Sequence, residues 1–339
     1  MPKIKVYRYL IPLLFLGLAI AILLMKVTTI AETLSAFLLM PFWIVGFAVI
    51  SQICSYLGNG YLLKVIVSHV QCRLSVFRGA LITMASDSIG LAGGTFGAAA
   101  AKFYWISKND EDLGEAALAG IIPLLYNTIV LIVISIIGMT YLLFKNQLSS
   151  TQLLIYGLVV VIMGATILFA LYGLRHQEKV KSLVLWITKI VTVIPILKRL
   201  KLTKDLTSLQ FYLDKFYSSI SLLKNQGLIK RALGPTLNTL FDMATLYLFF
   251  IAAGYSIHPG ILLAGYSLSY LFGRYAFIVP GGAGIIEAGM VVIFTNLGIS
   301  SNVSVVVVLG YRFLSFWLPS LLGFPTMLYL QRSTRERKT

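Results

Sequence analysis

The stretch PGGAGIIEA, which runs from Pro280 to Ala288, decides the fold because it places a helix breaker, three glycines and a carboxylate inside apolar sequence. In a bilayer, non-helical backbone is tolerated only where protein buries it or where it lines a wet cavity. An ionisable residue at membrane depth is costly and implies a functional role. The stretch is therefore a candidate site as well as a break in a helix.

The composition around this stretch is that of a polytopic membrane protein. The chain has 339 residues, of which 58% are hydrophobic and only 12% charged, and its mean hydropathy is +0.88. Several apolar runs are long enough to cross a bilayer. The first, Leu10 to Met25, has two interpretations, a cleavable signal peptide or a retained anchor. We expect an anchor, because the apolar core exceeds the usual signal length and no clear cleavage site follows.

The net charge of +16 is concentrated in particular regions. Residues 175–231 hold twelve of the twenty-eight Lys and Arg against three acids, and the C-terminal tail is also basic. Under the positive-inside rule these regions and the N-terminus face the cytoplasm of a cell or inner membrane. A nucleic-acid partner is the rival explanation, but no stacking-aromatic pattern or known motif accompanies the charge. Lipid headgroups, mainly anionic ones, are the expected counter-ions.

When each apolar run is given a direction from the basic residues that flank it, the sequence predicts an all-α protein of one membrane domain, residues 1–339. It has about six full spans and two re-entrant helical hairpins, counted together as eight membrane segments. The hairpins are expected at residues 79–101 and 257–298, and an amphipathic interfacial helix at residues 60–78. The full spans are expected at residues 10–25, 37–57, 118–144, 153–174, 232–253 and 303–330.

An internal repeat appears when Gly93-Gly94 is aligned with Gly281-Gly282. The first repeat covers residues 37–144 and the second covers residues 232–330, with the basic amphipathic segment 175–231 between them. Matching Gly138 with Gly323 places Tyr126-Asn127 on Tyr311-Arg312. The flanking spans run in opposite directions, so the repeat is predicted to be inverted. Inverted repeats with broken helices are an architecture of transporters.

The Pro-Gly-Gly-x-Gly-x-x-Glu-Ala run near the end of such a chain resembles the flippase-like integral membrane family that includes the transmembrane domain of lysylphosphatidylglycerol synthase. The resemblance covers nearly the whole chain, and Arg312 matches more loosely. It implies that the embedded part moves lipids between leaflets. The first half departs from the family pattern at residues 91–97, where Lys102 is a candidate for the missing cation, and Asn127 stands where a charge is common.

Five ionisable residues at apparent membrane depth form the candidate substrate site. Glycine-flanked helix ends and arginines suit a phosphate headgroup, so an anionic phospholipid or a polyprenyl-phosphate-linked glycolipid is the expected substrate. The glycine alignment also allows Arg274 and Asp87 to approach each other. The candidate substrate-binding residues are Asp87, Asp242, Arg274, Glu287 and Arg312; the hairpin backbone positions are Gly93, Gly94, Pro280, Gly281, Gly282 and Gly284.

Other chemistry finds little support in the sequence. The two cysteines and three histidines show no ligand spacing, so we expect no metal and no cofactor. A lipid-modifying enzyme would need a nucleophile or base with an orienting partner; no such motif is present, and no catalytic residue is assigned. Residues 202–223 form an apolar heptad stripe. The stripe either packs on the cytoplasmic face of the bundle or docks a protein partner, which leaves open a scaffold for a glycosyltransferase.

Overall fold

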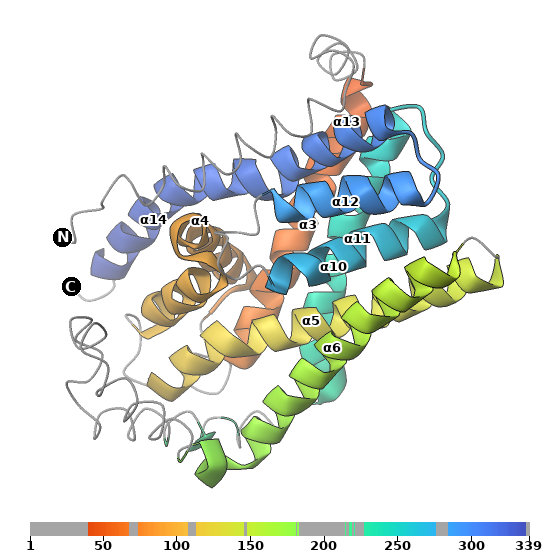
Figure 1. The fold of residues 1–339 in the computed structure, drawn as a ribbon. Helices are drawn as coiled ribbons and strands as arrows, with labels where there is room; N and C mark the ends of the chain where they lie inside the picture. The colour runs from red at the N-terminus through yellow and green to blue at the C-terminus, as the bar shows by residue number, and fades with distance from the viewer. Residues whose placement is uncertain are drawn as a thin grey trace, which may run out of the picture.

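The computed structural model describes residues 40–67, 74–107, 113–145, 148–180, 227–275 and 284–336, together with a few isolated positions between 182 and 220. This part of the chain is helical, as Figure 1 shows. The helices are α3 (Phe42–Ile66), α4 (Val76–Ser107), α5 (Leu113–Phe144), α6 (Ser150–Arg175), α10 (Leu228–Ala252), α11 (Pro259–Tyr275), α12 (Ile285–Asn296), α13 (Ser301–Arg312), the π-helix η2 (Phe313–Trp317) and α14 (Leu318–Glu336).

Five of the described helical stretches are long and apolar enough to cross a membrane: α3, α5, α6, α10 and the continuous rod from Ser301 to Ser333. The prediction of an all-helical polytopic membrane protein is therefore confirmed. The first expected span, Leu10 to Met25, lies outside the described residues.

Helix α6 begins with a capping box, in which Ser149 Oγ accepts from the backbone N–H of Gln152 at 3.3 Å and Gln152 Oε1 accepts from the backbone N–H of Ser149 at 2.9 Å.

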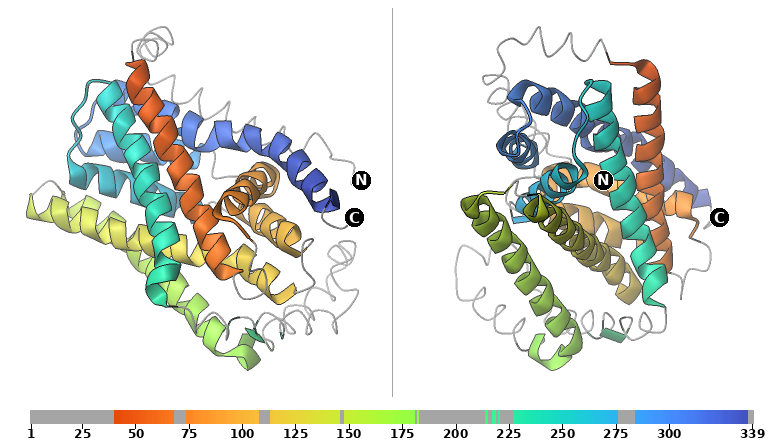
Figure 2. Two further views of the ribbon diagram at one scale, coloured as in Figure 1. Left: turned by 180° about the vertical axis from the view of Figure 1, so that it is seen from behind. Right: turned by 90° about the vertical axis from the view of Figure 1, so that its right-hand side faces the viewer.

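Helices α3 and α10 lie side by side along their length, as both views in Figure 2 show. They run antiparallel, because Ser51 Oγ donates to the carbonyl of Phe241 at 2.7 Å while Asn238 Nδ2 donates to Ser55 Oγ at 2.7 Å. Glycines allow the backbones to meet: a Cβ added to Gly58 would lie 2.6 Å from the backbone nitrogen of Asn238. Small residues permit this close approach between membrane helices.

The prediction of an interfacial helix at residues 60–78 is wrong. Helix α3 continues to Ile66, where Leu62, Leu63 and Ile66 are buried, and α4 begins at Val76. The apolar positions that resembled the membrane-facing side of a surface helix are instead covered by the bundle. Lys64, one of the four basic residues on which the prediction of an interfacial helix rested, stays exposed near the end of α3.

The close α3–α10 contact makes a stability prediction. Gly58→Ala would push a methyl group into backbone atoms that cannot rotate away, and overpacking of this kind costs about 1 to 3 kcal/mol. Gly46→Ala on the same helix is the matched control, because nothing lies within 4 Å of its added Cβ. We expect thermal unfolding in detergent to begin at a lower temperature for Gly58→Ala only. Equal midpoints for the two variants would contradict the packing described here.

Two helix pairs lie between the spans. Helix α4 is broken at Gly94, whose φ of 60° and ψ of −157° are not helical. Its arms, residues 76–93 and 95–107, fold back on each other, because a Cβ added to Gly97 would lie 3.3 Å from the carbonyl oxygen of Ile89. We call these arms the first helix pair. Helices α11 and α12 form the second helix pair, in which Gly265 lies against Phe294 and Gly273 against Ile286. Residues 276–283, with Pro280, Gly281 and Gly282, lie outside the description.

Each helix pair packs on a long helix that lies elsewhere in the chain. On α4, Ser88 Oγ donates to the carbonyl of Ser320 at 2.5 Å, and Gly323 of α14 lies against Met84 and Ser88. On α11, Ala264 and Leu263 lie against Gly138 of α5. Gly138 and Gly323 are therefore each a point of close contact between a span and a helix pair. In Figure 1 the arms of α4 lie between α14 and α5.

Most of the segment 202–223 lies outside the described residues. At one described position within it, Tyr217 donates its hydroxyl to the carbonyl of Gly173, near the end of α6, at 2.7 Å. Ile220 is buried with Leu62 and Trp105 in an apolar cluster. These contacts agree with packing on the bundle, and docking of a protein partner stays a prediction.

Candidate functional site

A cavity of about 300 Å³ lies where the two helix pairs meet the spans α3, α5, α10 and α13. Its wall is rich in groups that form hydrogen bonds, which is unusual for the interior of a membrane protein. The charged side chains at the wall are Asp87, Lys102, Asp242, Arg274 and Arg312, and the neutral polar ones include Gln52, Ser55, Asn59, Thr83, Thr95, Asn127, Asn238, Thr239 and Ser315.

Four of the five predicted substrate-binding residues therefore share this cavity: Asp87, Asp242, Arg274 and Arg312. Glu287 does not line it. Of the hairpin glycines, Gly94 lies at the wall, whereas Gly93 is exposed beside it. Lys102, the candidate for the missing cation of the first half, also lies at the wall.

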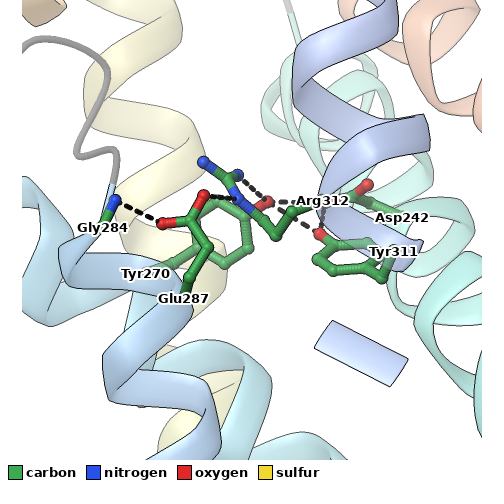
Figure 3. A network of polar contacts seen from close by, with 6 residues as sticks. All are labelled: Asp242, Tyr270, Gly284, Glu287, Tyr311 and Arg312. Carbon is green, nitrogen blue, oxygen red and sulfur yellow. Dashed lines mark hydrogen bonds and ion pairs between the residues drawn. The ribbon is translucent and has the colours of Figure 1, made fainter. Parts of the chain in front are cut away.

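Glu287 lies behind Arg312, and the two side chains form a buried ion pair (Figure 3). Arg312 Nε lies 2.7 Å from Glu287 Oε1, with the side chains only 3% and 1% exposed. The other carboxylate oxygen, Oε2, accepts from the backbone N–H of Gly284 at 2.7 Å. Gly284 has a φ of 86°, in the left-handed region that favours glycine, and precedes the first residue of α12. Glu287 thus ties the start of α12 to Arg312.

Asp242 is the centre of a second buried network. Its Oδ2 accepts from the hydroxyls of Tyr311 at 2.6 Å, Tyr266 at 2.7 Å and Tyr270 at 3.3 Å. Tyr270 also accepts from Arg312 Nη1 at 3.3 Å, so the two networks are continuous (Figure 3). Sequence reasoning missed these tyrosines. Tyr266 and Tyr270 are four residues apart on α11 and share one face, a spacing that usually indicates apolar packing.

Arg274 and Asp87 both reach the cavity, but no ion pair joins these two described residues. Arg274 Nη1 donates to the carbonyl of Leu124 at 3.4 Å, and Asp87 Oδ2 accepts from Tyr56 at 3.3 Å. The two residues therefore share the cavity wall, and the closer approach that the glycine alignment allows stays a prediction. Phe316 of η2 lies against Arg312, with the guanidinium carbon 4.3 Å from the ring centroid.

Several polar atoms at the wall have no hydrogen-bond partner within the described part of the chain, although their residues are buried or partly buried. They come from five elements: Asn127 Oδ1, Asp242 Oδ1, Arg274 Nε, Arg312 Nη2 and Ser315 Oγ. Buried polar groups are nearly always paired, so each such atom calls for an explanation. Ser315 lies in the π-helix, a local distortion that is frequent at functional sites.

The described residues contain no group of three His, Cys, Asp or Glu side chains that could hold a metal ion. The site's arrangement is instead that of a binding cavity. Cationic groups face it from α4, α11 and α13, and hydroxyl and amide groups face it from α3, α5, α10 and η2. Such a wall can replace part of the hydration of a charged headgroup.

A comparison with known protein families finds a match over nearly the whole chain. The family model of the lysylphosphatidylglycerol synthase TM region matches residues 14–323. The chain belongs to this family. The match to the lysylphosphatidylglycerol synthase TM region extends over both helix pairs and every wall residue of the cavity, so the resemblance seen in the PGGAGIIEA stretch is confirmed.

Two archaeal relatives of the chain carry the description UPF0104 membrane protein. The protein from Methanocaldococcus jannaschii is 27% identical over 137 residues, which is 40% of each chain. The protein from Methanothermobacter thermautotrophicus is 29% identical over 98 residues, or 29% of each chain. The aligned region therefore spans less than half the length of these relatives. Both relatives are described as membrane proteins, which is consistent with the match to the family model.

Proposed function

We propose that the protein moves an anionic phospholipid, or a polyprenyl-phosphate-linked glycolipid, between the leaflets of the cell membrane through the cavity between its two helix pairs. The observation that carries the proposal is the pair of arginines at the cavity wall, Arg274 and Arg312, each with a nitrogen that no described group satisfies. A phosphate oxygen is the natural acceptor for such nitrogens.

The physical need for such a cavity is plain. An unaided phosphodiester would have to leave water and cross hydrocarbon with its charge unpaired, which is strongly unfavourable. Cationic and hydroxyl groups inside the protein lower that barrier without any covalent change. The acyl chains would remain in the bilayer beside the apolar outer surface of the protein. Leu154, Val161 and Phe169 of α6 are examples of the exposed apolar residues on this surface.

The proposal includes an inverted repeat with two re-entrant hairpins. The first half consists of α3, α4 and α5, and the second of α10, the α11–α12 pair and the α13–α14 rod. Three contacts support a twofold relation: α3 with α10 antiparallel, α14 on the first arm of α4, and α5 on α11. An inverted pair of broken elements around a central site suits alternating access, in which the two halves rock about the bound headgroup.

The proposed orientation makes a topological prediction. Both termini and residues 175–231 are cytoplasmic, and the loop at residues 145–152 is external. Single cysteines at Asn146 and Thr334, in a chain without Cys54 and Cys72, should react differently with an impermeant thiol reagent added to intact cells. Only the cysteine at position 146 should be labelled, and the cysteine at position 334 should react after the membrane is opened. Labelling of both from outside would contradict the orientation.

Reconstitution tests the function itself. Purified protein in vesicles should move fluorescent phosphatidylglycerol from the inner to the outer leaflet, where an impermeant quencher removes its signal. Vesicles that carry Arg274→Ala protein should show a rate lower by about tenfold, as expected for loss of a charged hydrogen bond. A membrane-embedded enzyme would instead yield a chemically altered lipid without translocation. A scaffold would yield neither, so both alternatives have distinct outcomes.

A further inference from the structure

The unsatisfied atoms of the cavity wall are of two opposite kinds. Arg274 Nε and Arg312 Nη2 are donors that carry positive charge and find no acceptor among the described residues. Asp242 Oδ1 and Asn127 Oδ1 are acceptors that find no donor in the same part of the chain, and Ser315 Oγ can act as either. A ligand that completes the wall must therefore bring acceptors and donors together.

A phosphate alone does not meet this need. Its oxygens would satisfy the two arginines, but the carboxylate of Asp242 would face another anion without a donor between them. Asp242 Oδ2 already accepts three tyrosine hydroxyls, two of which are drawn in Figure 3, and this fixes the carboxylate in place while Oδ1 has no partner among the described residues. The wall thus requires a hydrogen-bond donor close to the phosphate.

Hydroxyl groups fit this wall better than an ammonium group. The wall carries many neutral amide and hydroxyl side chains, which exchange hydrogen bonds with hydroxyls in both directions. An ammonium group offers three donors and no acceptor, so it could not accept from the amide and hydroxyl donors of the wall. The cavity volume of about 300 Å³ equals that of roughly ten water molecules, enough for a phosphate with a small polyol.

Building on the translocation proposed above, we infer that the cavity recognises a phosphodiester whose substituent carries hydroxyl groups. The phosphate lies between Arg312 and Arg274, and the hydroxyls reach Asp242, Asn127 and Ser315. A glycerol headgroup and a phosphate-linked sugar share this chemistry. An amine-bearing headgroup and a bare phosphate monoester do not.

A binding experiment separates these headgroups without relying on transport. Purified full-length protein in detergent, loaded with fluorescent phosphatidylglycerol, is challenged with phosphatidylglycerol, phosphatidic acid, phosphatidylethanolamine or a short polyprenyl-phosphate sugar. Phosphatidylglycerol or the sugar lipid should displace the probe at a concentration lower by about tenfold than the other two, the effect of one good hydrogen bond to a charged group. The stronger of the two hydroxylated competitors identifies the source of the polyol. Equal competition by phosphatidic acid, or preference for the amine lipid, would overturn the inference.

Variants connect the preference to named atoms. Ser315→Ala and Asp242→Asn should each reduce the advantage of phosphatidylglycerol over phosphatidic acid, and Asp242→Asn should also strengthen phosphatidic acid binding, because it removes the anion that faces the phosphate. Ser135→Ala is the control, because Ser135 Oγ is also buried with no partner in the described part of the chain but is not part of the cavity wall. If Asp242→Asn does not fold, Ser315→Ala alone decides. An unchanged preference in Ser315→Ala would count against the polyol site. Selective binding without translocation would contradict the proposed function but support this inference. Translocation without headgroup preference would support the proposed function but contradict this inference.

Discussion

Arg312→Ala is expected to reduce the amount of folded protein sharply, because it leaves the carboxylate of Glu287 buried without its cation. That carboxylate is only 1% exposed, and its remaining bond runs to the N–H of Gly284. Breaking a buried ion pair by removing one partner costs about 3 to 5 kcal/mol. The measurement is the yield of monodisperse protein after detergent extraction, followed by its thermal unfolding midpoint.

Two further variants separate folding from function at this position. Arg312→Ala combined with Glu287→Gln removes both charges and should recover much of the yield, but not translocation. Arg312→Lys should retain the ion pair with Glu287 and the fold. It should nevertheless lower translocation of anionic lipid by about tenfold, since an ammonium cannot hold Glu287, Tyr270 and a phosphate oxygen in the fork geometry of a guanidinium. Wild-type translocation by Arg312→Lys would show that Nη2 has no ligand.

Gly94→Ala should also have a large effect, for a backbone reason. The φ of 60° and ψ of −157° at Gly94 belong to a region that is essentially restricted to glycine, and a side chain there costs about 1 to 3 kcal/mol. Because Gly94 is the break between the arms of α4 and lies at the cavity wall, the strain would shift Asp87 and Lys102 relative to the arginines of the wall. We expect translocation to fall more than protein yield.

Gly93→Ala is the matched control for this prediction. Gly93 is the preceding residue, has helical backbone, is exposed, and has nothing within 4 Å of an added Cβ. Its substitution should leave yield and translocation near those of the wild type. If both alanines behave alike, the break at Gly94 is not what places the wall residues.

The residues of the cavity could be predicted from sequence where a charge interrupts apolar surroundings. Asp87, Asp242, Arg274 and Arg312 stood out for that reason, and all four line the cavity. The glycine pairs likewise indicated two broken helices. Such signals are local, because burying a charge or breaking a helix in lipid needs a compensating reason at that position.

The other residues of the site could not be predicted, because their roles depend on contacts between segments that are distant in the sequence. Tyr266, Tyr270 and Tyr311 gain their role only because α11 and α13 place three hydroxyls on one oxygen of Asp242. In the sequence they look like ordinary packing aromatics. The pairing of Glu287 with Arg312 likewise requires α12 and α13 to meet, and this pairing places Glu287 behind the wall. Residues 60–66 were misassigned because their burial depends on packing against α4 and α5 and, at Leu62, against Gly234 of α10.

Blocking the cavity chemically tests most directly whether lipid passes through it. In a chain without Cys54 and Cys72, Thr95→Cys places a thiol at the cavity wall, and Phe96→Cys places one on the adjacent residue, which is 71% exposed and not part of the wall. Both proteins are reconstituted, modified with a membrane-permeant maleimide until mass spectrometry shows complete reaction, and assayed for translocation of phosphatidylglycerol. The account predicts that modification stops translocation by the Thr95→Cys protein and spares that by the Phe96→Cys protein. Full translocation by completely modified Thr95→Cys protein would contradict it.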